Sequence, residues 1–256
     1  MGKVVTLHSY KGGTGKTLFA INLAATFAKQ GKKVCLFDLD FRAPSIFSLL
    51  KLSKPEFWLN DYLNNSCEID KVIIDASSRI SGNGKFFIGP ACPETEAIRA
   101  MSSKNRKWEM RALGKLLHLR HTLLNEKGFD YLIFDSSPGL QYSSINAIVT
   151  ADLVVVVTTG DESDVDGTTR MLRELYNLFS MKTVIVINKV LDYNSQATQE
   201  ELDNRIKKIY QVPSLGIVPC FCDVLRSKGS FIFVERMPEH PFSKLLNEMT
   251  KKIDAY

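Results

Sequence analysis

A glycine-rich loop between a short apolar run and an amphipathic run is the feature that most limits how this chain can fold. Residues 4–8 are mostly β-branched or apolar, residues 11–17 read Lys-Gly-Gly-Thr-Gly-Lys-Thr, and a helical pattern begins at Lys16. The glycines let the backbone turn tightly, so that its N–H groups and the positive end of the helix dipole face phosphate oxygens. In such a loop Lys16 reaches the β- and γ-phosphates and the Thr17 hydroxyl holds Mg²⁺. The sequence therefore predicts a site for nucleotide phosphates near the start of the chain.

The remainder of the chain alternates short β-branched runs with longer amphipathic runs. The runs that predict strands are Val4–His8, Lys33–Asp38, Lys85–Ile88, Tyr131–Phe134, Leu153–Val157, Thr183–Ile187 and Leu215–Val218. The runs that predict helices are Lys16–Gln30, Lys107–Lys127, Asp164–Phe179, Gln196–Tyr210 and Pro241–Ile253. Strands that are apolar on both faces belong in a parallel sheet covered by helices, with right-handed crossovers. We expect an α/β fold with a mostly parallel sheet and helices on both faces. It would be one domain of residues 1–256, with short helices and loops in 41–84.

Composition and charge set further limits. The 256 residues are 45% apolar and 24% charged, which excludes a disordered, collagen-like or coiled-coil chain. The longest apolar run, residues 153–157, is far too short to cross a bilayer. Five scattered cysteines without a secretory signal predict reduced thiols and a cytoplasmic location. A net charge of +5 permits an anionic partner without requiring one.

The loop departs from the strict phosphate-loop pattern at one position. That pattern has a glycine where this chain has Tyr10, and the next residue is Lys11. In this the loop resembles the deviant Walker A motif of the MinD/ParA family, whose members are P-loop ATPases with a Rossmann-like three-layer fold. The resemblance implies that Lys11 reaches across an ATP-bound homodimer to the phosphates of the other subunit. It also implies that the nucleotide is ATP, held by Lys11, Gly12, Gly13, Thr14, Gly15, Lys16, Thr17 and Leu18.

Two acidic motifs follow in the order that this family has. Asp38 and Asp40 end one apolar run and Asp135 ends another, and α/β sheets bind ligands at the carboxyl ends of their strands. The resemblance implies that Asp38 holds Mg²⁺ through water, that Asp40 orients the attacking water, and that Asp135 contacts the Mg²⁺ hydration shell. Residues 136–139 resemble switch II, a loop that responds to the γ-phosphate. The expected metal site is Thr17, Asp38 and Asp135, and the expected catalytic residues are Lys11, Lys16 and Asp40.

Two further residues predict where the base binds. Asn188 ends an apolar run, and its amide can both donate to and accept from an adenine edge. Pro219 lies in a segment that resembles the one that closes over the base in this family. We therefore expect Asn188 and Pro219 to contact the adenine.

The resemblance as a whole predicts a molecular switch. ATP joins two subunits, and hydrolysis, slow without an unidentified regulatory protein, separates them. The expected task is intracellular positioning or partitioning. Two alternatives stay open, an ATPase for metal-centre maturation and a protein that holds nucleotide with little hydrolysis. Bacterial tyrosine autokinases resemble the chain at residues 38–44, but they carry a C-terminal tyrosine cluster where this tail offers only Tyr256, and they lack a lysine at position 11.

A basic helical face raises the question of an anionic partner. Lys104, Lys107, Arg111 and Lys115 follow one another at spacings of a helical turn. The opposing apolar side is predicted to consist of Leu113, Leu116, Leu117 and Leu124. The basic face is either a solvated surface, which we favour, or a patch for the DNA backbone or an acidic protein.

Two other features could indicate a metal or a membrane. Cys220 and Cys222 form a CxC pair that could share Zn²⁺ across a dimer, although we favour two small half-buried residues in the base-binding segment. The run 241–253 has a marked apolar face. We expect this run to dock on the sheet rather than lie on a membrane.

Overall fold

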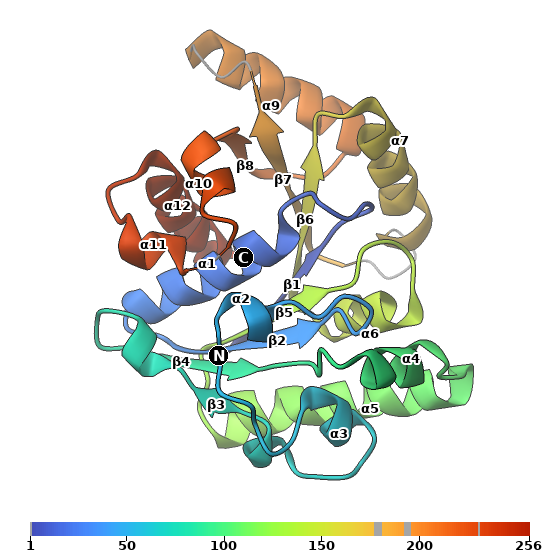
Figure 1. Cartoon of the computed structure of the whole chain (residues 1–256). Helices are drawn as coiled ribbons and strands as arrows, with labels where there is room; N and C mark the ends of the chain where they lie inside the picture. The colour runs from blue at the N-terminus through green and yellow to red at the C-terminus, as the bar shows by residue number, and fades with distance from the viewer. Residues whose placement is uncertain (1, 177–180, 192–195, 230) are drawn as a thin grey trace.

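An eight-stranded sheet runs through the computed structural model, which describes residues 2–176, 181–191, 196–229 and 231–256 (Figure 1). Its strands are β1 (Lys3–His8), β2 (Lys33–Leu39), β3 (Ile74–Asp75), β4 (Lys85–Gly89), β5 (Tyr131–Ser136), β6 (Leu153–Thr159), β7 (Thr183–Val190) and β8 (Ser214–Pro219). The spatial order is β3-β4-β2-β5-β1-β6-β7-β8. Only β3, at one edge, pairs antiparallel among the described residues. The mostly parallel sheet predicted from the sequence is confirmed.

Alternation along the central strands gives the sheet two buried faces. In β1, Val4 packs into one hydrophobic cluster and Val5 into the other, and both side chains are fully buried. In β6, Val154 and Val155 divide between the same two clusters. A strand buried on both faces needs helices above and below it.

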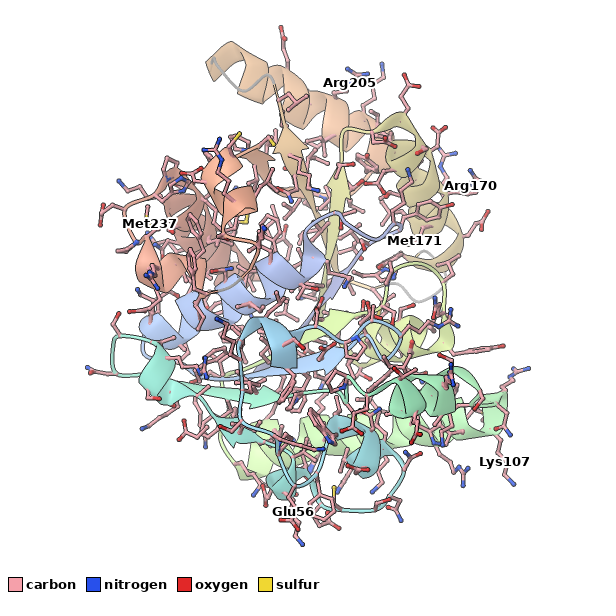
Figure 2. The ribbon with its side chains drawn as sticks, viewed as in Figure 1. Glu56, Lys107, Arg170, Met171, Arg205 and Met237 are labelled. Atoms are coloured by element: carbon pink, nitrogen blue, oxygen red, sulfur yellow. The ribbon has the colours of Figure 1, made fainter. Side chains whose placement is uncertain are left out.

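The helices supply these two layers (Figure 1). They are α1 (Lys16–Lys29), α2 (Ile46–Leu49), α3 (Leu59–Leu63), α4 (Thr95–Ser102), α5 (Arg106–His121), α6 (Tyr142–Thr150), α7 (Glu162–Met171), α9 (Gln196–Tyr210), α10 (Cys222–Arg226), α11 (Phe233–Arg236) and α12 (Pro241–Ala255). Helices α1, α11 and α12 pack on one face, and α5, α6, α7 and α9 pack on the other. On α7, Met171 points into the core and Arg170 points into solvent (Figure 2).

Several short elements escaped prediction. Elements of two to nine residues are too short to show a clear hydrophobic period. Those missed for this reason are strand β3 and helices α4, α6, α10 and α11. The short helical turns at Ile69–Lys71 and Ser77–Arg79 lie in the segment 41–84, where short helices were expected. The helix predicted over 164–179 begins earlier, at Glu162, and continues as a π-type turn over Leu172–Tyr176. Residues 177–179 of that prediction lie outside the described residues.

The predicted apolar face of α5 is wrong in one residue. The buried side chains are Trp108, Ala112, Leu116 and Leu119, at helical spacings of four, four and three. Leu117 lies off this stripe and is 45% exposed. The predicted helix 107–127 ends its regular part at His121 and continues as a π-type turn over Thr122–Glu126, where Leu124 is buried.

Helix α12 packs into the core as predicted. Phe242, Leu246, Met249 and Ile253 are buried against α1 and β8. Helices α10 and α11 lie between it and Pro219 in the chain, whereas the sequence led us to expect none there. Among the described residues, no helix combines the length and apolar character that crossing a membrane requires.

Candidate nucleotide site

The loop between β1 and α1 has the backbone that phosphate binding requires. Gly13 and Gly15 have positive φ angles of 79° and 102°, which non-glycine residues rarely adopt. A Cβ atom on Gly15 would lie 2.5 Å from the Asn188 side-chain nitrogen, so this position has no room for a side chain. Helix α1 begins directly after Gly15 and directs its free N–H groups and its dipole toward the loop.

Lys16 forms a buried ion pair at the foot of this loop. Its Nζ lies 2.9 Å from Asp135 Oδ1, and the two side chains are 8% and 0% exposed. Burial acts to lower the pKa of Lys16, but Asp135, and then Asp40 and Asp38, outweigh it, so the net shift is upward. The ammonium is therefore charged and held next to Asp135 at the foot of the loop.

Two carboxylates lie next to each other beside Lys16. Asp38 and Asp135 are partners in the β2–β5 register, and both are fully buried. Burial first, and then the charge of Asp135, raises the pKa of Asp38 to about 7, although N–H groups of Ser45 and Ile46 donate to it at 3.0 and 3.1 Å. Two neighbouring carboxylates in an apolar setting make a site that favours a cation.

The site has unused polar atoms that suit a phosphate with its metal. Thr14 Oγ1 and Asp135 Oδ2 are buried and have no hydrogen-bond partner among the residues that the structure describes. Thr17 is half-buried in the first turn of α1. Mg²⁺ prefers oxygen ligands and keeps several waters, so Thr17, Asp38 and Asp135 fit a hydrated Mg²⁺.

Asp40 lies at the edge of this buried group and is half-buried. Ser137 Oγ donates to Asp40 Oδ1 at 3.1 Å, and the Ala43 N–H donates to the same oxygen at 3.3 Å. The segment after β2 is thus joined to the segment after β5. Ser137 belongs to the segment 136–139 that was expected to be switch II, but its contact with Asp40 was not predicted, because the two residues lie 97 positions apart.

Lys11 lies apart from the phosphate cradle. Its Nζ lies 3.0 Å from Asp161 Oδ1 and also contacts the Ser163 hydroxyl, at the start of α7. Hydrogen bonds from Ser163 and then Lys11 hold the pKa of Asp161 well below its usual value. Asp161 and Ser163 were not predicted, because nothing in a sequence links them to a lysine 150 residues earlier. Their contact keeps Lys11 at the surface, with 39% of its side chain exposed.

Asn188 and Pro219 line one pocket of about 270 Å³ next to the loop, as the prediction of a base site requires. The Asn188 amide donates to the Thr14 carbonyl at 2.7 Å, so Asn188 also braces the loop. Its oxygen has no donor from the described chain. Leu18 and Cys220 also line this pocket. Cys222 is exposed on α10.

A buried histidine connects β1 to the segment expected to be switch II. His8 Nε2 lies 2.9 Å from the Gly139 carbonyl, and His8 Nδ1 lies 2.6 Å from the Tyr176 hydroxyl. A carbonyl only accepts, so Nε2 carries the proton and Nδ1 accepts from Tyr176. Burial lowers the pKa of His8 to about 4, and the charge of Lys16 adds to this effect. His8 is therefore neutral at pH 7.

Comparisons with known proteins agree with this geometry. A family model described as an AAA domain matches residues 2–192. The chain belongs to the MinD/ParA family of P-loop ATPases. The septum site-determining protein MinD of Thermotoga maritima is 27% identical over 256 residues, which cover 99% of this chain and 88% of that protein. Members of this family use ATP and Mg²⁺.

Solved structures show the same fold. MinD of Pyrococcus horikoshii, complexed with Mg-ADP, superimposes with a TM-score of 0.77 at 19% identity, over 99% of this chain and 96% of that chain. A putative plasmid partition protein of Borrelia burgdorferi, bound to AMPPNP, gives 0.77 at 21% identity, over 100% and 99%. The predicted P-loop ATPase fold is thereby confirmed.

Proposed function

We propose that this chain is an ATP-driven molecular switch that forms a homodimer when it binds ATP and separates after hydrolysis. The observation that carries the proposal is the division between the two lysines of the loop. Lys16 is buried at the phosphate cradle, whereas Lys11 is at the surface and bound to Asp161 of its own chain. A lysine placed there is accessible to the nucleotide of a second subunit.

The proposed mechanism assigns a role to each polar group. Lys16 and the N–H groups of residues 12–17 hold the β- and γ-phosphates of ATP. Asp40, held by Ser137, orients a water for in-line attack on the γ-phosphate. Thr17, Asp38 and Asp135 would hold Mg²⁺, which neutralises charge on the phosphates. Leu18, Asn188 and Pro219 contact the adenine, and the Asn188 side-chain oxygen can accept from the exocyclic amine.

The cellular role is proposed from the named relatives. One relative determines the septum site and one structural neighbour is a putative plasmid partition protein, so intracellular positioning or partitioning is the role that we propose. We expect one domain of residues 1–256, a cytoplasmic location and slow turnover until a regulatory protein binds. Metal-centre maturation and nucleotide holding with little hydrolysis remain the alternatives. Measuring phosphate release by the isolated protein distinguishes an ATPase from a protein that holds nucleotide with little hydrolysis.

Contact with DNA through the basic face stays a prediction. Lys104 and Lys115 lie over the rings of Trp108 and Tyr62, while Lys107 and Arg111 are exposed. Binding to the DNA backbone would weaken steeply with salt, because each neutralised phosphate releases counterions.

Two substitutions test the switch, because the proposed roles of Lys11 and Asp40 differ. Lys11→Ala should still bind ATP but stay monomeric, since Lys11 lies outside the cradle. Asp40→Ala should bind ATP and dimerise but lose hydrolysis by orders of magnitude, because an alanine cannot orient a water. Size-exclusion chromatography with light scattering in Mg²⁺-ATP, together with phosphate release, measures both effects.

The exposed Lys51, replaced by alanine, is the matched control and should behave as the parent. If Lys11→Ala dimerises as readily as the parent, the cross-subunit role of Lys11 is refuted. If Asp40→Ala turns over ATP at the parental rate, Asp40 has no part in hydrolysis.

A further inference from the structure

A second pocket lies where the two segments that leave the nucleotide site meet α5. It has a volume of about 280 Å³, and its lining includes Phe41, Arg42, Lys104, Trp108, Leu140 and Tyr142. Phe41 and Arg42 directly follow Asp40, and Leu140 directly follows Gly139. The walls of this pocket are therefore continuous with the segments that carry Asp40 and Ser137.

Two residues that line this pocket have exposed apolar side chains, since Tyr142 is 56% exposed and Leu140 is 47% exposed. Met110, which directly follows the lining residue Glu109 on α5, is 68% exposed. Asn146 of α6 donates to the Glu109 backbone and side chain, which holds α6 against this part of α5. We call the pocket residues together with Arg106, Lys107 and Met110 the α5–α6 surface. Aromatic side chains and methionine exposed next to a pocket are typical of the centre of a protein interface.

The charge of the α5–α6 surface is strongly positive. Arg42 and Lys104 line the pocket, and the exposed Arg106 and Lys107 lie in the chain between the lining residues Lys104 and Trp108. Lys107 points away from the molecule into solvent (Figure 2). Glu109 is the one carboxylate among the described residues that line the pocket. Arg42 lies near it and balances its charge, which leaves Lys104, Arg106 and Lys107 as the excess cations. The surface therefore has unneutralised positive charge around an apolar centre.

We propose that the α5–α6 surface binds a partner protein through an acidic segment that carries apolar side chains. The apolar side chains would occupy the pocket between Trp108 and Tyr142, and the carboxylates would pair with Arg106, Lys107 and their neighbours. A DNA backbone would make no contact with the exposed apolar centre, because phosphates are bound by cations and polar donors. This inference deepens the proposed function, since it gives the chemistry of the expected regulatory protein.

The test begins with a random peptide library displayed on phage and selected on the full chain without nucleotide. Clones that bind the parent are then counter-selected on the double variant Arg106→Glu/Lys107→Glu. These two residues open α5, where acidic side chains favour the helix dipole, so the variant should fold as the parent. The matched control is Lys208→Glu/Lys251→Glu, which changes the net charge equally at exposed positions on α9 and α12.

The proposal expects selected peptides with several Asp or Glu and at least one large apolar residue. Their affinity, measured by fluorescence anisotropy, should fall about tenfold or more in the charge-reversed variant, as close charge pairs predict, and stay within about twofold in the control. Leu140→Ser/Tyr142→Ser should weaken the same peptides, whereas salt alone should not abolish binding.

Three results would overturn the proposal. The selection could give no peptide that binds the parent more tightly than the charge-reversed variant. The peptides that do so could instead be neutral or basic. A 30-base-pair duplex could also bind the parent and lose affinity in the variant while no acidic peptide does so, which would make the surface a DNA site. Calorimetric titration with ATP on the same preparations distinguishes failure of this proposal from failure of the proposed function. Loss of ATP binding would refute the proposed function, whereas the peptide measurements would still test the α5–α6 surface.

Discussion

Protonation of His8 should destabilise the folded chain as the pH falls below about 6.5. The pKa of this ring drops from 6.5 in an exposed setting to about 4 in the fold, chiefly because the ring is fully buried. Above pH 6.5 the ring is neutral in both states, so the folded state keeps its full stability. Between pH 6.5 and 4, His8 binds a proton in the unfolded chain but stays neutral in the folded chain.

The size of the effect follows from this difference in pKa. Each unit of pKa shift is worth about 1.4 kcal/mol, so the free energy of unfolding should fall by about 3 kcal/mol between pH 6.5 and pH 4 through this group. Below pH 4 both states bind the proton and the loss levels off. A proton on Nδ1 would also remove the acceptor that the Tyr176 hydroxyl uses at 2.6 Å.

Urea unfolding of the parent and of His8→Gln at pH values from 4 to 8 measures this contribution. Glutamine keeps an N–H that can donate to the Gly139 carbonyl but does not titrate. The difference in unfolding free energy between parent and variant should be constant above pH 7 and shift against the parent by about 3 kcal/mol at pH 4. His118→Gln, on the exposed side of α5, serves as the control and should follow the parent. A difference between parent and His8→Gln that does not change with pH would show that burial of His8 is not maintained in solution.

Three further predictions concern the site and the core. Lys16→Ala should abolish ATP binding in a calorimetric titration, because the loop has no other buried cation next to Asp135, and unchanged affinity would remove the loop from nucleotide binding. Asp161→Asn should leave ATP affinity as in the parent and let the dimer form at lower protein concentration in light scattering, because Lys11 is released; weaker dimerisation would show that Asp161 supports the interface instead. Leu246→Ala should lower the free energy of unfolding by about 2–5 kcal/mol, whereas Leu191→Ala, at an 82% exposed position, should change it little; equal effects would contradict the docking of α12.

The sequence predicted the sheet and the phosphate loop because both leave strong local patterns. Runs such as 153–157 are apolar on both faces, and a Gly-Lys-Thr at a strand-to-helix junction has few other uses. Leu117 was assigned to the wrong face because the leucines at 113, 116 and 117 all fit an apolar stripe in the sequence. The burial of Trp108 and Ala112 in the structure shows which face of α5 packs on the core. The Lys11–Asp161 and His8–Gly139 contacts join residues more than 100 positions apart, and only the sheet order brings those strand ends together.

The charges of the site explain why it needs both a lysine and a metal ion. Asp38, Asp40 and Asp135 outnumber the one lysine beside them, and the pKa of Asp38 is raised first by burial and then by the charge of Asp135. A polyphosphate brings still more negative charge to the same place, so it can enter only with additional cations. Mg²⁺ held by Thr17, Asp38 and Asp135 would supply positive charge from within the subunit, and in the proposed dimer Lys11 would supply it from the other subunit. In the proposed dimer, each Lys11 would exchange its contact with Asp161 for the phosphates bound by the other subunit, so nucleotide binding and dimerisation would be linked through this charge balance.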